Sequence, residues 1–333
     1  MRRAAVFGTG SWGTTFAMVL ADAGAEVTLW GRRIALTEQI NREHVNGDYL
    51  PGIELPVSVR ATTDPVLALR DADLVVLAVP SQTLRANLAL WRDLLPRGAP
   101  VVSLMKGVEL GTSRLMSEVI TEVGGVEPER VAVVSGPNLA REIALRQPAA
   151  SVVACTDHAT AELLAHDCAT TYFRPYTGTD VVGTEIGGAV KNVIALAVGM
   201  AQGLGLGDNS KASLITRGLA ETTRLGEALG ADPITFAGLA GVGDLIATCL
   251  SPLSRNRTFG ERLGAGMSVA QVVADTQQTA EGVTSCLSIL ELAEAHGVDM
   301  PIVASVVAVV HHGLDPREMG QRLISRARRP EQD

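Results

Sequence analysis

The sequence predicts an α/β amino-terminal domain over residues 1–183 and an all-helical carboxy-terminal domain over residues 184–326. The length of 333 residues suits about two domains, because a domain typically has about 150 residues. Short apolar runs alternate with helical stretches in the first half, which is typical of a parallel sheet covered by helices. The second half has helical patterning almost throughout. Residues 327–333 are charged, and we expect this tail to be frayed.

The amino-terminal segment has the pattern of a dinucleotide-binding domain. An apolar strand (3–7) is followed by the spacing G-x-G-x-x-G and a helix (14–23). Gly8 would permit the tight turn, Gly10 would let a pyrophosphate approach the backbone, and Gly13 would let helix and strand pack closely. The helix amino terminus then offers free N–H groups to the phosphates. We therefore predict a Rossmann-like domain, although a purely structural turn can have the same spacing.

The residues after the next predicted strand (26–30) indicate the type of cofactor. A carboxylate here usually binds the free ribose of NAD, but this sequence has Trp-Gly-Arg-Arg at 30–33. The guanidinium groups of Arg32 and Arg33 could bind the 2′-phosphate of NADP. We favour NADP and keep NAD as the alternative. The two arginines could instead be a solvated pair at a helix start.

Further predicted elements bring several loops to one edge of the sheet. The expected strands are 57–62, 73–80, 100–104, 131–135 and 149–154. The expected helices are 82–95, 113–123 and a third that ends at about 170. Ligands bind beyond the carboxyl ends of parallel strands, so these loops should form one rim. The rim would consist of residues 8–13, 80–81, 105–107 and 135–138, and would include Lys106.

The second half is predicted to consist of helices. Their expected ranges are 181–204, 209–229, 233–249, 280–296, 298–315 and 316–326. One apolar stretch, 181–206, is long enough to cross a membrane. It contains Glu185 and Lys191, which are costly in a bilayer, so we predict a buried helix instead.

Lysine is scarce in this chain. Only Lys106, Lys191 and Lys211 are lysines among the 28 basic residues. An amine can be tuned to release a proton, whereas a guanidinium cannot. Lys191 lies in an apolar helix rich in small residues. Burial and a nearby cation would lower its pKa towards that of a general acid working near neutrality. We expect Lys211 to have a structural or charge-pairing role.

Two polar segments of the second half could complete a site. Gly-Val-Gly-Asp at 241–244 would present a carboxylate at a turn, or be an ordinary helix start. Ser-Arg-Asn-Arg at 254–257 could clamp a phosphate through bidentate guanidinium contacts, or be a solvated charge run.

Composition narrows the classes of partner. The net charge of −8 and 3% aromatic content disfavour nucleic acid and anionic membranes as partners, and an anionic ligand would need a local basic site. The four cysteines form no CxxC pair and suit the reduced thiols of a cytoplasm. The six histidines have no zinc-ligand spacing, so we expect no metal. Glycines interrupt the apolar run at the amino terminus, which disfavours a signal peptide.

In order and combination, these motifs resemble the bacterial NAD(P)-dependent glycerol-3-phosphate dehydrogenases over about residues 4–325. The matching segments are GTGSWG at 8–13, KG at 106–107, SGP at 135–137, EIGGAVKN at 185–192, LITRG at 214–218, GLAGVGDL at 238–245, SRNR at 254–257 and EG at 281–282. The resemblance implies reversible reduction of dihydroxyacetone phosphate to sn-glycerol 3-phosphate for glycerophospholipid synthesis. It also implies a cytoplasmic homodimer.

The resemblance further implies residue roles. The catalytic residues would be Lys191 as acid/base, with Lys106, Asp244 and Thr248. Substrate would contact Lys106, Gly136, Asn138, Lys191, Asp244, Ser254, Arg255 and Asn256. The dinucleotide would contact Gly8, Gly10, Ser11, Trp12, Gly13, Arg32, Arg33, Tyr49, Lys106, Ala140, Arg255, Thr279 and Glu281. Asn138 departs from the Ser or Thr that is common in the family, and Trp12 replaces another aromatic residue.

Two alternative functions remain at this stage. A 3-hydroxy-acid or sugar-acid dehydrogenase of similar architecture can also have a Lys-Asn pair in the first helix of its second domain. The cluster at 254–257 and the turn at 243–244 favour a phosphate ester over these substrates. A non-catalytic NADP-binding sensor would need the glycine motif, but not Lys106, Lys191 and Asp244 together.

Overall fold

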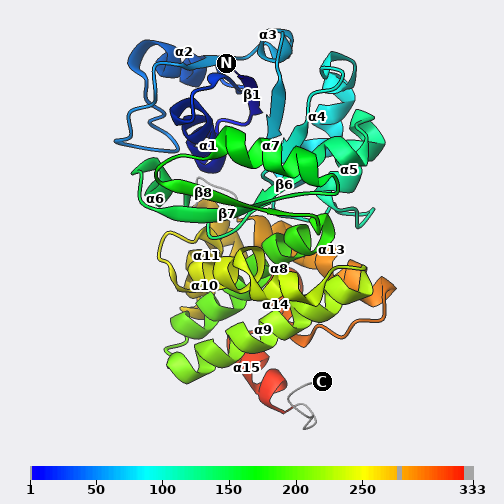
Figure 1. The fold of residues 1–333 in the computed structure, drawn as a ribbon. Helices are drawn as coiled ribbons and strands as arrows, with labels where there is room; N and C mark the ends of the chain where they lie inside the picture. The colour runs from blue at the N-terminus through cyan, green and yellow to red at the C-terminus, as the bar shows by residue number, and fades with distance from the viewer. Residues whose placement is uncertain (1, 276–279, 326–333) are drawn as a thin grey trace.

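The computed structural model describes residues 2–275 and 280–325. A sheet domain, blue to green in Figure 1, is followed by a helical domain that continues to the carboxyl end. The predicted frayed tail, 327–333, lies outside the described residues. The fold class predicted from the sequence is confirmed.

Eight strands form a single sheet. They are β1 (Arg3–Phe7), β2 (Glu26–Trp30), β3 (Val59–Thr62), β4 (Leu74–Leu77), β5 (Val101–Ser103), β6 (Val131–Ser135), β7 (Ala149–Cys155) and β8 (Phe173–Gly178). Their spatial order is β3-β2-β1-β4-β5-β6-β7-β8, and each neighbouring pair is parallel except β6 with β7. Every residue of β4, β5 and β6 is buried, because helices cover both faces. This explains why these strands are continuous apolar runs rather than alternating ones.

Helices cover the two faces of the sheet. On one face lie α1 (Ser11–Asp22), α2 (Ile34–Glu43), α6 (Ala140–Ala144) and α7 (His158–Cys168). On the other lie α3 (Pro65–Leu69), α4 (Leu84–Trp91) and α5 (Met116–Gly124). Short 3-10 turns are η1 (Ser81–Thr83), η2 (Arg92–Leu94) and η3 (Pro128–Arg130).

The helical domain is built around α8 (Val181–Gly203), at the centre of the lower half of Figure 1. Around it lie α9 (Asp208–Ala228), η4 (Pro233–Ala237), η5 (Leu239–Gly243), α10 (Asp244–Leu250), α11 (Arg255–Gly264), α12 (Val269–Ala274), α13 (Glu281–Ala295), α14 (Pro301–His312) and α15 (Pro316–Ile324). Within the described ranges, α8 is the one helix long and apolar enough to span a membrane, and 94% of its apolar window is buried. The prediction of a buried core helix is confirmed.

Glycines let α11 approach α8 closely. A Cβ atom at Gly199 would collide with the carbonyl of Arg257, and one at Gly260 would collide with the carbonyl of Leu196. Only glycine permits such backbone contact. The amino terminus of α11 is thereby placed beside Asn192, the neighbour of Lys191.

The single helix predicted over 233–249 is wrong. The chain forms η4, a π-helical turn (η5) and α10, and Gly241 has non-helical backbone angles. Gly241 packs against the backbone of Phe236 too closely for any side chain, so the chain folds back there. Strand β8 and helices α2, α3, α6, α11 and α12 were not predicted. The sheet ends at Gly178 and α8 begins at Val181, so the boundary predicted after residue 183 falls in the first turn of α8.

Candidate active site

The loop between β1 and α1 contains three glycines, and each has different surroundings. Gly8 has φ of +128°, and a Cβ there would collide with the carbonyl of Ala78. A Cβ at Gly13 would collide with the carbonyl of Gly8. Gly10 has no atom within 4 Å of its would-be Cβ, so the fold does not require glycine there. It has no side chain to cap the amino terminus of α1, where free N–H groups remain for an anion. This open cradle fits a pyrophosphate.

A cavity of about 560 Å³ opens at this loop and extends to the helical domain. The predicted residues that line it are Gly8, Gly10, Ser11, Trp12, Gly13, Arg32, Tyr49, Lys106, Asn138, Ala140, Lys191, Thr248, Ser254, Arg255, Asn256 and Glu281. Asp244 is buried behind this surface, and Gly136 and Arg33 do not line it. Thr279 lies outside the described residues. Most of the predicted site is therefore gathered around one cavity.

Two helices and one strand end bring the predicted catalytic side chains together. Lys106 follows β5, and its Nζ donates to Asp244 Oδ2 at 2.6 Å and to the Gly136 carbonyl at 3.1 Å. Lys191 on α8 donates to Asp244 Oδ1, and to Thr248 Oγ1 at 2.7 Å. Asp244 and Thr248 are one turn apart on α10. One buried carboxylate thus joins the two amines.

The environment of Lys191 suits reversible proton transfer. Its pKa is lowered to about 7. Burial is the largest cause, because it destabilises the charged form; Asp244 opposes this effect, and the Lys106 ammonium adds to it. A group with this pKa exchanges a proton readily near neutrality.

The start of α11 forms a second polar wall of the cavity. Ser254 caps the helix by accepting from the Arg257 N–H at 3.2 Å, and the next residue, Arg255, is exposed. The buried Asn256 amide donates to Asn192 at 3.0 Å and accepts from the Gly282 N–H at 2.9 Å. A guanidinium beside a helix amino terminus attracts an anionic group. Sequence reasoning did not assign a role to Asn192, although the Lys-Asn pair was visible.

The two arginines after β2 have different surroundings. Arg32 lines the cavity. Arg33 forms an ion pair with Asp48 at 2.7 Å and lies over the Tyr49 ring, 5.4 Å from its centroid. Asp48 had no signal in the sequence, because its proximity to Arg33 arises from the fold. The Tyr49 carbonyl also accepts from the Ser11 hydroxyl at 3.0 Å, which ties this segment to the glycine loop.

The loop after β6 contributes a buried, unpaired oxygen. The Asn138 amide nitrogen donates to the Ser151 hydroxyl at 3.1 Å, while its Oδ1 is buried with no partner. Ser135 Oγ is likewise buried with no partner. Asn138 lines the cavity as a residue, although its Oδ1 atom is itself buried.

Two other predictions concern residues away from the cavity. Lys211 on α9 forms an ion pair with Asp208 at 2.8 Å and donates to Gln202 at 2.9 Å, so the predicted charge pairing is confirmed. The His, Cys, Asp and Glu side chains of the described ranges form no group of three that could hold a metal ion.

Comparisons with known proteins cover nearly the whole chain. The amino-terminal and carboxy-terminal family models described as NAD-dependent glycerol-3-phosphate dehydrogenase match residues 3–161 and 180–321. A protein of Streptomyces griseus named glycerol-3-phosphate dehydrogenase (NAD(P)+) is 66% identical over 329 residues, covering 99% of this chain and 98% of its own. This chain belongs to the NAD-dependent glycerol-3-phosphate dehydrogenase family.

Further relatives agree with this assignment. A Streptomyces coelicolor protein of the same name is 67% identical over 329 residues, covering 99% of this chain and 98% of its own. The crystal structure of glycerol-3-phosphate dehydrogenase from Coxiella burnetii has a TM-score of 0.93 and 35% identity, covering 98% of this chain and 99% of that one. The predicted family of dehydrogenases is therefore confirmed. The comparisons do not favour the two alternatives, a 3-hydroxy-acid or sugar-acid dehydrogenase and a non-catalytic NADP-binding sensor.

Proposed function

We propose that this protein reduces dihydroxyacetone phosphate to sn-glycerol 3-phosphate, reversibly, with NADPH or NADH. The observation that carries the proposal is the cluster of Lys106, Asp244 and Lys191 at the cavity that begins at the glycine loop. A dinucleotide site and a proton donor therefore adjoin the same space. This combination is what ketone reduction requires.

The dinucleotide is held by the glycine loop, the amino terminus of α1 and Arg32. When bound, it supplies the hydride that adds to the ketone carbon. The open face at Gly10 supports pyrophosphate binding, because a Cβ there would occupy that space. Arg32 lines the cavity where an acidic residue would exclude a 2′-phosphate, so NADP is favoured and NAD is accepted.

Lys191 supplies the proton. Hydride addition leaves negative charge on the former ketone oxygen, and the Lys191 ammonium stabilises that charge and gives it an N–H proton. The neutral amine then regains a proton from water. Asp244 and Thr248 orient the amine, and Lys106 adds positive charge beside the oxygen. In the oxidative direction, neutral Lys191 removes the hydroxyl proton.

The phosphate of the substrate binds at the start of α11. Arg255 provides a fixed positive charge, and Ser254 and Asn256 provide polar groups around the helix amino terminus. The chain has a net charge of −8, so an anionic substrate needs such a local concentration of cations. Asn138 lines the cavity and contacts the glycerol part, whereas Gly136 acts through its carbonyl, which holds the Lys106 amine.

We further propose that the protein is a cytoplasmic homodimer that supplies glycerophospholipid synthesis. The four cysteines are buried free thiols, which supports a reducing compartment. Light scattering of the purified protein tests the dimer.

The function is tested by the oxidation of NADPH and of NADH with dihydroxyacetone phosphate as acceptor. We expect turnover with both cofactors. At low cofactor concentration, turnover with NADPH should be faster than with NADH. Absence of turnover with both would contradict the proposed substrate.

A further inference from the structure

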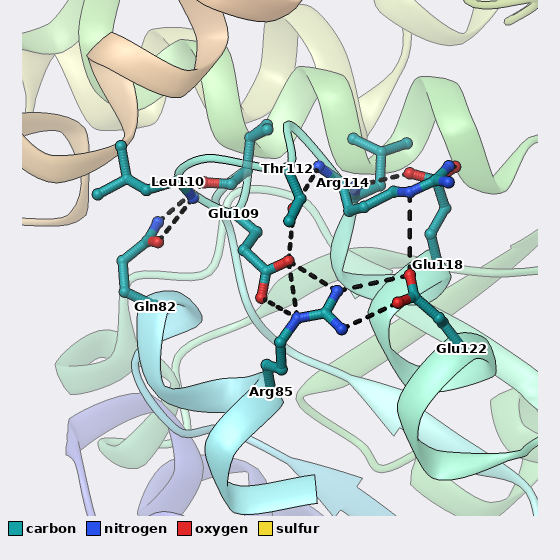
Figure 2. A network of polar contacts seen from close by, with 10 residues as sticks. Gln82, Arg85, Glu109, Leu110, Thr112, Arg114, Glu118 and Glu122 are labelled. Atoms are coloured by element: carbon teal, nitrogen blue, oxygen red, sulfur yellow. Dashed lines mark hydrogen bonds and ion pairs between the residues drawn. The ribbon is translucent and has the colours of Figure 1, made fainter. Parts of the chain in front are cut away.

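The segment from Lys106 to Ser117 joins the active site to α5, and the sheet domain holds it firmly. Figure 2 shows Arg85 of α4 donating to the buried carboxylate of Glu109 at 2.9 and 3.1 Å. The Gln82 side chain accepts from the Leu110 N–H at 2.9 Å. These contacts fix the segment to η1 and α4.

The helical domain holds the same segment from the other side. Ser288 on α13 donates to the Val108 carbonyl at 2.8 Å. Asn192 on α8 donates to the Lys106 carbonyl at 3.3 Å. The position of Lys106 relative to the helical domain therefore depends on contacts across the domain boundary.

Glu185 makes a further contact across this boundary, with a carboxylate. It lies near the start of α8, with 4% of its surface exposed, and its carboxylate accepts from the Ser117 N–H at 3.0 Å and from the Ser117 hydroxyl. Ser117 is in the first turn of α5, where N–H groups lack helical partners. A side chain of the helical domain thus caps a helix of the sheet domain.

The same helix carries Glu185 and Lys191. Six residues of α-helix span about 9 Å, so the cap and the proposed proton donor are rigidly linked. Asn192 adjoins Lys191 and contacts Lys106. Helix α8 is therefore held at two places against the segment 106–117, once at each end of that segment.

We propose that Glu185 is a positioning residue. By capping α5 across the domain boundary, it fixes the position of α8 relative to the segment 106–117. Lys191 is thereby kept beside Asp244 and Lys106. The proposal rests on the proposed role of Lys191 in the reduction of dihydroxyacetone phosphate. Loss of the cap should lower turnover, because small displacements of a reacting group can reduce the rate by more than tenfold.

Glu221 provides a matched control within the same chain. It is 2% exposed and accepts from the Ile302 and Val303 N–H groups at 2.8 and 3.3 Å, at the start of α14. Burial raises the pKa of Glu185 and of Glu221 to about 7 in each case. The two carboxylates are thus chemically similar, but Glu221 on α9 joins two helices of one domain.

The experiment compares Glu185→Ala with Glu221→Ala at a temperature at which circular dichroism shows both folded. Both variants should have a lowered Tm. Only Glu185→Ala should lose about tenfold in kcat, with KM for NADPH changed less than about twofold. In Glu185→Gln the amide can accept from the Ser117 N–H and donate to its hydroxyl, so kcat should recover to within about threefold of wild type.

Equal kcat values for Glu185→Ala and Glu221→Ala would overturn the proposal, as would a Gln variant no more active than the Ala variant. If Glu185→Ala does not fold, Ser117→Ala carries the test. This variant deletes one of the two hydrogen bonds to Glu185, so it should displace Lys191 less than Glu185→Ala does. We expect kcat to fall at least about twofold. Unchanged kcat in Ser117→Ala would overturn the proposal. A wild-type protein inactive on dihydroxyacetone phosphate would contradict the proposed function instead.

Discussion

The cavity has two walls that are assembled in different ways. The sheet wall consists of the loop 8–13, whose backbone lines the cavity, and of Arg32 after β2. The helical wall combines side chains of α8, α10 and α11: Lys191, Thr248 and Arg255. Backbone N–H groups bind phosphate whatever reaction follows, whereas the charged side chains act on the substrate. Changes to the two walls should therefore have separable effects on cofactor binding and on turnover.

The largest expected effect is on the helical wall. Lys191→Ala should lower kcat about 10³-fold, because the proton donor is lost, while the Kd for NADPH changes little. Steady-state kinetics and fluorescence titration of NADPH measure the two quantities. Lys211→Ala is the control and should keep wild-type kcat, since Lys211 pairs with Asp208 away from the cavity. Near-normal turnover of Lys191→Ala would refute its assigned role.

Arg255 should separate substrate binding from the chemical step. Arg255→Ala should raise KM for dihydroxyacetone phosphate by roughly 10- to 100-fold, because a charge-assisted contact to phosphate is lost. Arg262→Ala, near the other end of α11, is the matched control and should leave KM unchanged. An unaltered KM in Arg255→Ala would place the phosphate elsewhere.

The pH dependence tests the shared environment of Lys191. Reduction needs the ammonium, so kcat should fall roughly tenfold per pH unit above the pKa of about 7. Oxidation needs the neutral amine, so its kcat should rise with pH through the same range. Profiles in both directions, with a deuterated cofactor to show that hydride transfer limits the rate, provide the measurement. Flat profiles through neutrality would contradict the proton-transfer role.

The smallest effect is expected on the sheet wall. Arg32→Ala should raise the Kd for NADPH about tenfold. Arg33→Ala should raise this Kd less than about threefold, because Arg33 already pairs with Asp48. NADH binding should change little in either variant. Titration of both cofactors, including the double variant, tests this. Equal losses for NADPH and NADH would refute recognition of the 2′-phosphate.

The sequence predicted correctly those elements whose conformation depends on residues that are close together in the chain. The loop 8–13 and strand β6 could be predicted because their spacing and apolar patterns directly reflect backbone geometry. The helix predicted over 233–249 failed, because Gly241 folds against the backbone of Phe236. Helix α11 was missed because its sequence is polar and its helical packing depends on glycines that meet α8.

The sequence by itself determined the dinucleotide loop, the scarcity of lysine and the motifs that identify the family. It also placed Lys106 at a strand end and Lys191 in an apolar helix. Only the tertiary structure decided that Asp244 joins these two amines, that Asp48 pairs with Arg33 and that Glu185 caps α5. The physical reason is that spacing along the chain specifies local backbone geometry. Charges distant in sequence meet only after the helices have packed.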